Sequence, residues 1–202
     1  MKLKLFVGVV SLALSAVSVA EVQINPYANI KTGIANLRSV VGLPEDFSAS
    51  SVVLALAGGV NLRNDILGGR FEVEYSHYFR NNDRAHYLGG ILNVEQKVSS
   101  DSLMFNSYLD LYAGDLVNFY GFVGAGYARS KETISLTVTG YDGKLSGSDK
   151  FNGFSWQTGL GVMFNVSENF SVDAGFRYTN LYDKDDIKID ARTGFLGFSY
   201  KF

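Results

Sequence analysis

Apolar and polar residues alternate with a period of two along most of this chain, and this pattern limits its possible folds most strongly. The stretch Gly69–Phe79 (GRFEVEYSHYF) has aromatic and aliphatic residues at its odd positions. Its even positions carry Arg70, Glu72, Glu74 and Ser76. Phe154–Phe164 (FSWQTGLGVMF) and Phe170–Tyr182 (FSVDAGFRYTNLY) repeat the alternation. Side chains on a β-strand point alternately to its two faces, so each stretch predicts a strand with one apolar face.

Eight segments of this kind are predicted, each long enough to cross a bilayer as a tilted strand. They are residues 22–34, 51–62, 69–80, 98–112, 119–131, 151–164, 170–182 and 189–202. Short turns are predicted at 63–68, 113–118 and 165–169, and longer polar connections at 35–50, 80–97, 131–150 and 183–188. Short turns at one end and long loops at the other are typical of bacterial outer-membrane barrels. The predicted fold is therefore an all-β, eight-stranded antiparallel transmembrane barrel with short periplasmic turns.

A soluble barrel or sandwich would show the same alternation, with its apolar faces turned inward. Two details favour the membrane form. The polar faces combine charges with glycine, which suits a narrow polar interior, and the apolar faces end in aromatic residues, as interfacial girdles do. Beyond the N-terminus, no run approaches the 18 apolar residues that indicate a membrane helix.

The N-terminus predicts export. Lys2 and Lys4 precede an apolar run, and Ser18-Val19-Ala20 fits the small-x-small pattern of a signal-peptide cleavage site. We expect residues 1–20 to be removed and residues 21–202 to form one domain. The chain has no cysteine, so disulfides do not stabilise it, and its formal net charge of −2 gives no reason to expect nucleic acid as a partner.

Three stretches resemble a known family. FSWQTGLGVMFNVSENFSVDAGFRYTNLY, GRFEVEYSHY and the closing GFLGFSYKF are similar to the opacity-protein and neisserial surface protein A type of small OmpA-like barrel, often labelled "porin family". The resemblance implies an outer membrane of the Gram-negative type and the character of a surface antigen, and it implies no catalytic residue. It also implies that the barrel-insertion machinery reads the terminal aromatics. These are Phe198, Tyr200 and Phe202.

Charged residues on the polar faces predict a network inside the barrel. Its candidate members are Lys31, Glu72, Glu74, Asp110, Asp173, Arg177 and Lys201. An eight-stranded barrel is only wide enough for side chains to fill it, and a charge kept off the lipid must be paired. We expect a salt-bridged plug. The alternative is a narrow channel for ions or small solutes, lined by the same charges.

Neither an enzyme nor a metal site is favoured. A lipid-modifying enzyme would need a base beside a serine nucleophile. His77 and Ser76 are adjacent and point to opposite faces, and no His-x-Ser spacing occurs. The acidic stretch Asp183–Asp190 (DKDDIKID) lacks the glycine and glutamate of a calcium-binding EF-hand loop, so no cofactor is expected.

Recognition is therefore expected in the loops 35–50, 80–97 and 131–150. Candidate contacts to lipopolysaccharide phosphates or host polymers are Arg80, Asp83, Arg84, Tyr87 and Tyr141. Asp142-Gly143 indicates a tight hairpin turn, so residues 131–150 are expected to continue two strands as a ribbon. This ribbon is expected to be a stiff loop, and an exposed edge for a partner strand is the alternative. The predicted role is structural, adhesive or host-interacting. Outer-membrane lipid, lipopolysaccharide, the insertion machinery and a surface ligand are the expected partners.

Overall fold

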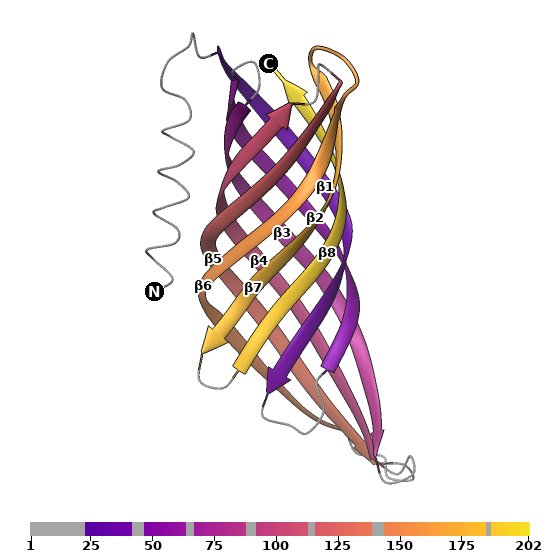
Figure 1. Cartoon of the computed structure of the whole chain (residues 1–202). Helices are drawn as coiled ribbons and strands as arrows, with labels where there is room; N and C mark the ends of the chain where they lie inside the picture. The colour runs from indigo at the N-terminus through magenta and orange to yellow at the C-terminus, as the bar shows by residue number, and fades with distance from the viewer. Residues whose placement is uncertain are drawn as a thin grey trace.

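The eight predicted strands form a closed antiparallel barrel in chain order (Figure 1). The structure, a computed structural model, describes residues 23–41, 47–63, 67–87, 92–112, 116–138, 144–184 and 187–202. The strands are β1 (Gln23–Val41), β2 (Phe47–Arg63), β3 (Leu67–Tyr87), β4 (Leu92–Tyr112), β5 (Val117–Val138), β6 (Lys144–Asn165), β7 (Phe170–Lys184) and β8 (Ile187–Lys201). Because β1 pairs with β8 from Tyr27–Lys201 to Val41–Ile187, the cylinder closes. The predicted fold class is confirmed.

Residues 1–20, the predicted signal peptide, lie outside the described residues, and their cleavage stays a prediction. Within the described residues, no helix is long and apolar enough to cross a membrane.

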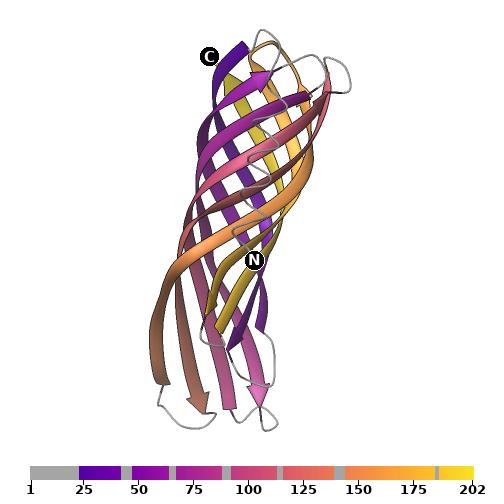
Figure 2. The same ribbon diagram turned by 60° about the vertical axis from the view of Figure 1, so that its left-hand side comes forward.

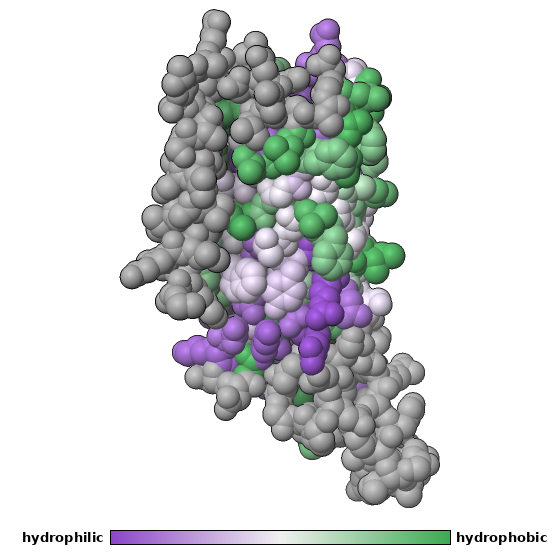
Figure 3. Space-filling view, viewed as in Figure 1, coloured by the Kyte–Doolittle hydropathy of each residue, from purple (hydrophilic) through white to green (hydrophobic). Residues whose placement is uncertain are grey.

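The alternation in sequence becomes an apolar outer wall and a polar interior. Leu56, Leu160 and Phe176 are at least half exposed on the outside, whereas Glu72, Gln157 and Thr179 are buried inside. Figure 3 shows apolar residues over the half of the barrel nearer the C-terminus and hydrophilic residues toward the opposite end. Since lipid is the solvent at the apolar band, aliphatic exposure there is favourable.

Two of the strand pairs end early at the extracellular end of the barrel, where the connections after β1, β3, β5 and β7 lie. Pairing of β2 with β3 stops at Val53–Tyr78, and pairing of β6 with β7 stops at Trp156–Asn180. The four strands between these points continue together and project beyond the rest (Figures 1 and 2). We call this four-stranded extension the projecting sheet. It comprises residues 79–87, 92–99, 130–138 and 144–155.

The projecting sheet corrects the predicted strand limits. Residues 80–87 and 92–97, predicted as parts of a loop, belong to β3 and β4, which stay paired up to Tyr87–Leu92. Backbone hydrogen bonds hold a hairpin together beyond the membrane, where lipid no longer selects apolar residues for one face, so the alternation that marked the transmembrane part fades there. The predicted ribbon in 131–150 is confirmed, because β5 and β6 pair up to Thr137–Lys144. Asp142-Gly143 lies outside the described residues.

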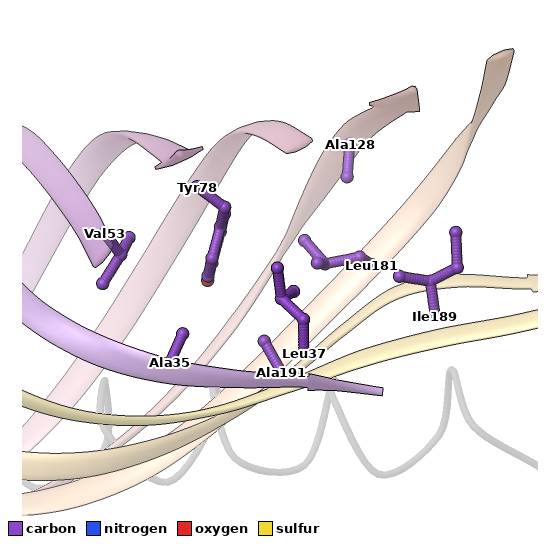
Figure 4. Close-up of a cluster of buried hydrophobic side chains, with 8 residues drawn as sticks. All are labelled: Ala35, Leu37, Val53, Tyr78, Ala128, Leu181, Ile189 and Ala191. Carbon is purple, nitrogen blue, oxygen red and sulfur yellow. The ribbon is translucent and has the colours of Figure 1, made fainter. Parts of the chain in front are cut away.

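An apolar cluster fills the extracellular half of the lumen (Figure 4). Leu37 comes near the end of β1 and Ile189 near the start of β8, so the cluster lies close to the extracellular rim. Its members are Ala35, Leu37, Val53, Tyr78, Ala128, Leu181, Ile189 and Ala191, each at most 4% exposed. This packing lies farther toward the rim than the buried charges Lys31 and Glu74, which precede Ala35 and Tyr78 on the same strands.

Candidate functional site

The centre of the lumen holds a four-membered ion cluster. It joins Lys31 of β1, Glu72 and Glu74 of β3, and Arg177 of β7. The Lys31 Nζ atom lies 2.7 Å from Glu72 Oε1 and 2.6 Å from Glu74 Oε2, and Arg177 Nη1 lies 2.6 Å from Glu74 Oε1. These side chains are at most 5% exposed. Such burial is tolerable because each charge meets an opposite charge at hydrogen-bond distance.

Neutral side chains complete the hydrogen bonding of the two glutamates. The hydroxyls of Tyr27 and Tyr108 donate to Glu72 at 3.0 and 2.8 Å, and the Ser76 hydroxyl donates to Glu74 at 2.9 Å. Asn106 donates to Glu72 at 3.3 Å and accepts from Gln157 at 2.7 Å. Polar groups from five strands therefore cross-link opposite walls of the cylinder, and such a buried network rigidifies its site, although Arg177 Nε has no hydrogen-bond partner among the described residues.

A second ion pair lies toward the periplasmic end. Arg70 Nε is 2.8 Å from Asp110 Oδ2, and the Arg70 guanidinium lies over the rings of Tyr108 and Tyr120 at 4.4 and 4.8 Å from their centroids. The Tyr120 hydroxyl in turn donates to Asp173 at 2.7 Å. Arginine suits this position because its planar cation both pairs with a carboxylate and stacks on aromatic faces.

The structure thus places six of the seven predicted lumen charges in two groups inside the barrel. Lys201 is the seventh and lies at the periplasmic end of β8, where Nζ is 3.3 Å from Asn165 Oδ1. Arg70 and Gln157 are not in the predicted network, although Arg70 shares the inward register of Glu72 and Glu74, and Gln157 lies on the polar face of its strand. Tyr27, Tyr108 and Tyr120 were missed because aromatic residues in a barrel strand are usually expected to face lipid.

The ion network and the apolar cluster both lie across the lumen. An ion that entered would have to displace paired charges at the centre and then pass the apolar side chains around Tyr78 and Leu181. The free energy of a bare ion is very high in an apolar layer. The arrangement is suited to holding the barrel rigid and is poorly suited to conduction.

On the outer wall, His77 binds Asp101 and has no serine partner. His77 Nδ1 lies 2.7 Å from Asp101 Oδ1, to which the Tyr75 hydroxyl also donates at 2.6 Å. Ser76 points into the lumen toward Glu74. Ser76 and His77 therefore lie on opposite sides of the wall, as the alternation of side-chain direction along the strand predicted. The described residues also contain no cluster of three or more histidine, cysteine, aspartate or glutamate residues able to hold a metal.

The terminal aromatics face outward at the periplasmic end. Phe198 and Tyr200 are 43% and 49% exposed, and Phe202 is 72% exposed with its ring 5.3 Å from that of Tyr200. The Phe202 amide donates to the Pro26 carbonyl at 3.0 Å, which ties the last residue to the first strand. Recognition of these residues by the insertion machinery stays a prediction.

The predicted loop contacts fall mostly on a strand. The backbones of Arg80, Asp83, Arg84 and Tyr87 belong to β3 in the projecting sheet, and Tyr141 lies outside the described residues. The cations Arg129, Lys131 and Lys150 were not among the predicted contacts. All three side chains are exposed on β5 and β6, where the projecting sheet leaves the barrel. Their shared parity was a usable signal, because residues 129 and 131 lie on the same face of one strand.

Three comparisons agree with this architecture. Residues 5–202 match the family described as outer membrane protein beta-barrel domain. The chain is 28% identical over 89 residues to outer membrane protein PagN of Salmonella typhimurium, covering 44% of this chain and 37% of that protein. It is 33% identical over 88 residues to the attachment invasion locus protein of Yersinia pseudotuberculosis, covering 44% and 41%. Each match spans about two fifths of the relative's length.

Among solved structures, the chain is similar to neisserial surface protein A, with a TM-score of 0.50 and 20% sequence identity. The similarity covers 87% of this chain and 97% of that one. At this level of identity the likeness concerns the fold alone.

Proposed function

The chain belongs to the outer membrane protein beta-barrel family and is a protein of the bacterial outer membrane, and from this premise we propose that it is a non-enzymatic attachment protein. The barrel is the anchor in this proposal, and the projecting sheet is the part that meets a partner outside the cell. Two relatives, an outer membrane protein and an attachment invasion locus protein, support this role.

One observation carries the proposal: four strands continue past the barrel rim while the lumen beneath them is closed. Pairing between β4 and β5 runs without a break from Tyr112–Asn118 to Leu92–Val138. A continuous ladder gives the extension a defined shape, and a preformed surface loses less conformational entropy on binding than a mobile loop does. The molecule therefore presents a rigid surface outside the membrane and no open path through it.

A channel is the less favoured function, because its path would have to pass both Arg177 and the apolar layer at Leu181. Single-channel recording on the refolded barrel in a planar bilayer distinguishes the two functions. We expect no discrete current steps from protein that is folded by its heat-dependent gel shift. Steady steps that change in the Arg177→Ala variant would support a channel instead.

Three classes of partner fit the proposal. Lipid and lipopolysaccharide surround the apolar band and its rim, and the outward-facing Phe198, Tyr200 and Phe202 are suited to contact the insertion machinery from the lipid side. A host or surface ligand would contact the projecting sheet. The first two classes concern assembly and residence in the membrane, and only the third concerns attachment.

Cell attachment tests the role directly. A non-adherent bacterium would express the wild-type chain or a variant in which residues 132–149 are replaced by a two-residue Asn-Gly turn, which shortens β5 and β6 to the level of Lys131 and Lys150. We expect attachment to epithelial cells or matrix-coated surfaces to fall to the background of the host strain. A matched control replaces Lys184–Lys188 at the β7–β8 connection and retains attachment. Equal attachment by both variants, with equal surface amounts, would refute the proposal.

A further inference from the structure

One edge of the projecting sheet is long, straight and open. Strand β6 has no β7 partner from Lys144 to Ser155. The part nearest the barrel is partly covered: Ser155 donates to the Asn180 carbonyl, and the Phe151 ring lies 5.4 Å from that of Tyr182. Beyond it, residues 145–150 are all exposed, and Leu145 is 73% exposed. The segment Lys144–Lys150 therefore offers unpaired backbone donors and acceptors to the outside, and we call it the β6 edge.

The opposite edge of the same sheet is a poorer template for pairing. On β3, a register shift between Tyr78 and Asn81 interrupts the ladder where that edge begins, and the Ser51 hydroxyl donates to the Phe79 carbonyl at 2.5 Å. Bulges are among the features by which natural proteins protect an edge strand. Along β6, in contrast, the register with β5 is continuous from Phe164 to Lys144. The open side of the sheet is thus the β6 side.

Cations gather on one face of the β6 edge in a way that is unfavourable for the isolated chain, whereas Asp149 lies on the other face, opposite Glu132. Lys150 lies directly opposite Lys131 in the β5–β6 register, and Arg129 is two residues from Lys131 on the same face. Like charges in directly opposed positions destabilise a strand pair. Among the described residues neither lysine has an acidic partner, whereas Arg129 lies opposite Asp101 on its other side. An anionic group beside Lys150 would remove this repulsion.

We propose that the β6 edge accepts an extended, acidic polypeptide segment as a fifth strand of the projecting sheet. Backbone hydrogen bonds along Lys144–Lys150 supply the binding, and a carboxylate of the segment lies opposite Lys150 with Lys131 behind it. The inference rests on the proposed function and names the class of partner. Antiparallel pairing of two copies centred on Gly147 would place Lys144 of one copy against Lys150 of the other, which disfavours self-pairing through this edge.

Peptide binding to the refolded mature barrel tests the proposal. The protein is placed in phosphatidylcholine nanodiscs, and the probe is a fluorescent nine-residue peptide of alternating glutamate and valine, followed by anisotropy. Two matched probes replace glutamate with lysine or carry N-methyl groups on alternate amides. The protein variants are Lys150→Gln and Lys131→Gln, with Lys188→Gln as the control because Lys188 is an exposed lysine outside the projecting sheet. The heat-dependent gel shift verifies that each variant is folded.

We expect the acidic peptide to bind and the lysine and N-methyl peptides to fail. Lys150→Gln and Lys131→Gln should each weaken binding about two- to fivefold, the effect of one cross-strand charge pair, while Lys188→Gln leaves it unchanged. Equal binding of the N-methyl peptide would overturn the proposal and indicate a site that recognises charge alone, such as a lipid phosphate. Spontaneous cross-linking of Ser148→Cys between copies would also overturn it, in favour of self-pairing.

The two proposals fail in different ways. If the acidic peptide does not bind while cells expressing the chain still attach, the strand-addition site is refuted and the attachment role stands. If the peptide binds but shortening β5 and β6 leaves attachment unchanged, the edge exists and the attachment role is refuted.

Discussion

Substitution of Glu74 by glutamine tests whether the ion cluster is connected as the structure indicates. Glu74 forms an ion pair with Arg177, and it shares Lys31 with Glu72. Glu74→Gln leaves Arg177, whose side chain is 2% exposed, without a carboxylate inside the barrel. Removing one member of a buried ion pair costs about 3–5 kcal/mol, because the remaining charge stays buried and unpaired.

The matched variant is Glu72→Gln, which removes an equally buried carboxylate from the neighbouring inward position of β3. Lys31 keeps Glu74 in that variant, so no cation is left unpaired and only hydrogen bonds to a charged acceptor are weakened. The expected loss is about 1–3 kcal/mol. The double variant Glu74→Gln/Arg177→Met removes the stranded cation and places an apolar side chain near Phe195. It should recover at least about 2 kcal/mol relative to Glu74→Gln.

Urea unfolding of the refolded barrel measures these differences. Trp156 is the only tryptophan, and its ring packs 5.4 Å from that of Tyr178 on the outer wall, so its fluorescence reports loss of the membrane environment. If the free energy of unfolding falls by about 2 kcal/mol per molar urea, Glu74→Gln should lower the urea concentration at the unfolding midpoint by about 1.5–2.5 M. Equal midpoints for Glu74→Gln and Glu72→Gln, or no recovery in the double variant, would refute the connectivity.

Three further predictions concern the wall of the barrel. Leu160→Lys, in the middle of the apolar band, should lower the free energy of unfolding in vesicles by about 2–4 kcal/mol, and an unchanged urea midpoint would contradict lipid contact there. Gly161→Ala should lower the free energy of unfolding by about 1–3 kcal/mol, because the added methyl would meet the Tyr120 hydroxyl and the Ala174 carbonyl. In the control Gly194→Ala the methyl has open space, so the loss in the same assay should be less than about 0.5 kcal/mol. Phe202→Ala should reduce the amount assembled in cells and leave detergent refolding unchanged, and normal cellular amounts on heat-shift gels would oppose a role in insertion.

Transmembrane strands were predictable from sequence because two solvents act on them at once. Lipid selects the residues at 154, 160 and 176, while the lumen selects those at 157 and 177, so the alternation is strong between the rims. Beyond the rim lipid no longer selects apolar residues for one face, and the alternation weakens. Residues 80–87 consequently lacked a strand signal, although pairing with β4 keeps them extended.

The lumen shows a different limit. Parity alone identified which charges point inward, and Glu72, Glu74 and Arg177 follow it. Parity does not reveal which inward groups meet across the barrel, since Lys31 and Arg177 come from strands that are distant in sequence. It does separate an inward tyrosine from a lipid-facing one, because Tyr108 shares the parity of Asp110, and only the usual expectation that aromatic residues face lipid hid it. Contacts across the barrel depend on strand tilt and stagger, which fix the height of each side chain and are absent from a single strand's pattern.

The ladder that shapes the projecting sheet has a consequence for how this protein can change over generations. Beyond Trp156, β6 extends for about 40 Å of strand, and its course is set by main-chain hydrogen bonds to β5 that do not depend on side-chain identity. Outward residues there can be replaced one at a time without altering the outline of the extension. A host that raises antibodies against those side chains would meet a surface whose amino-acid composition changes while its length beyond the membrane stays the same.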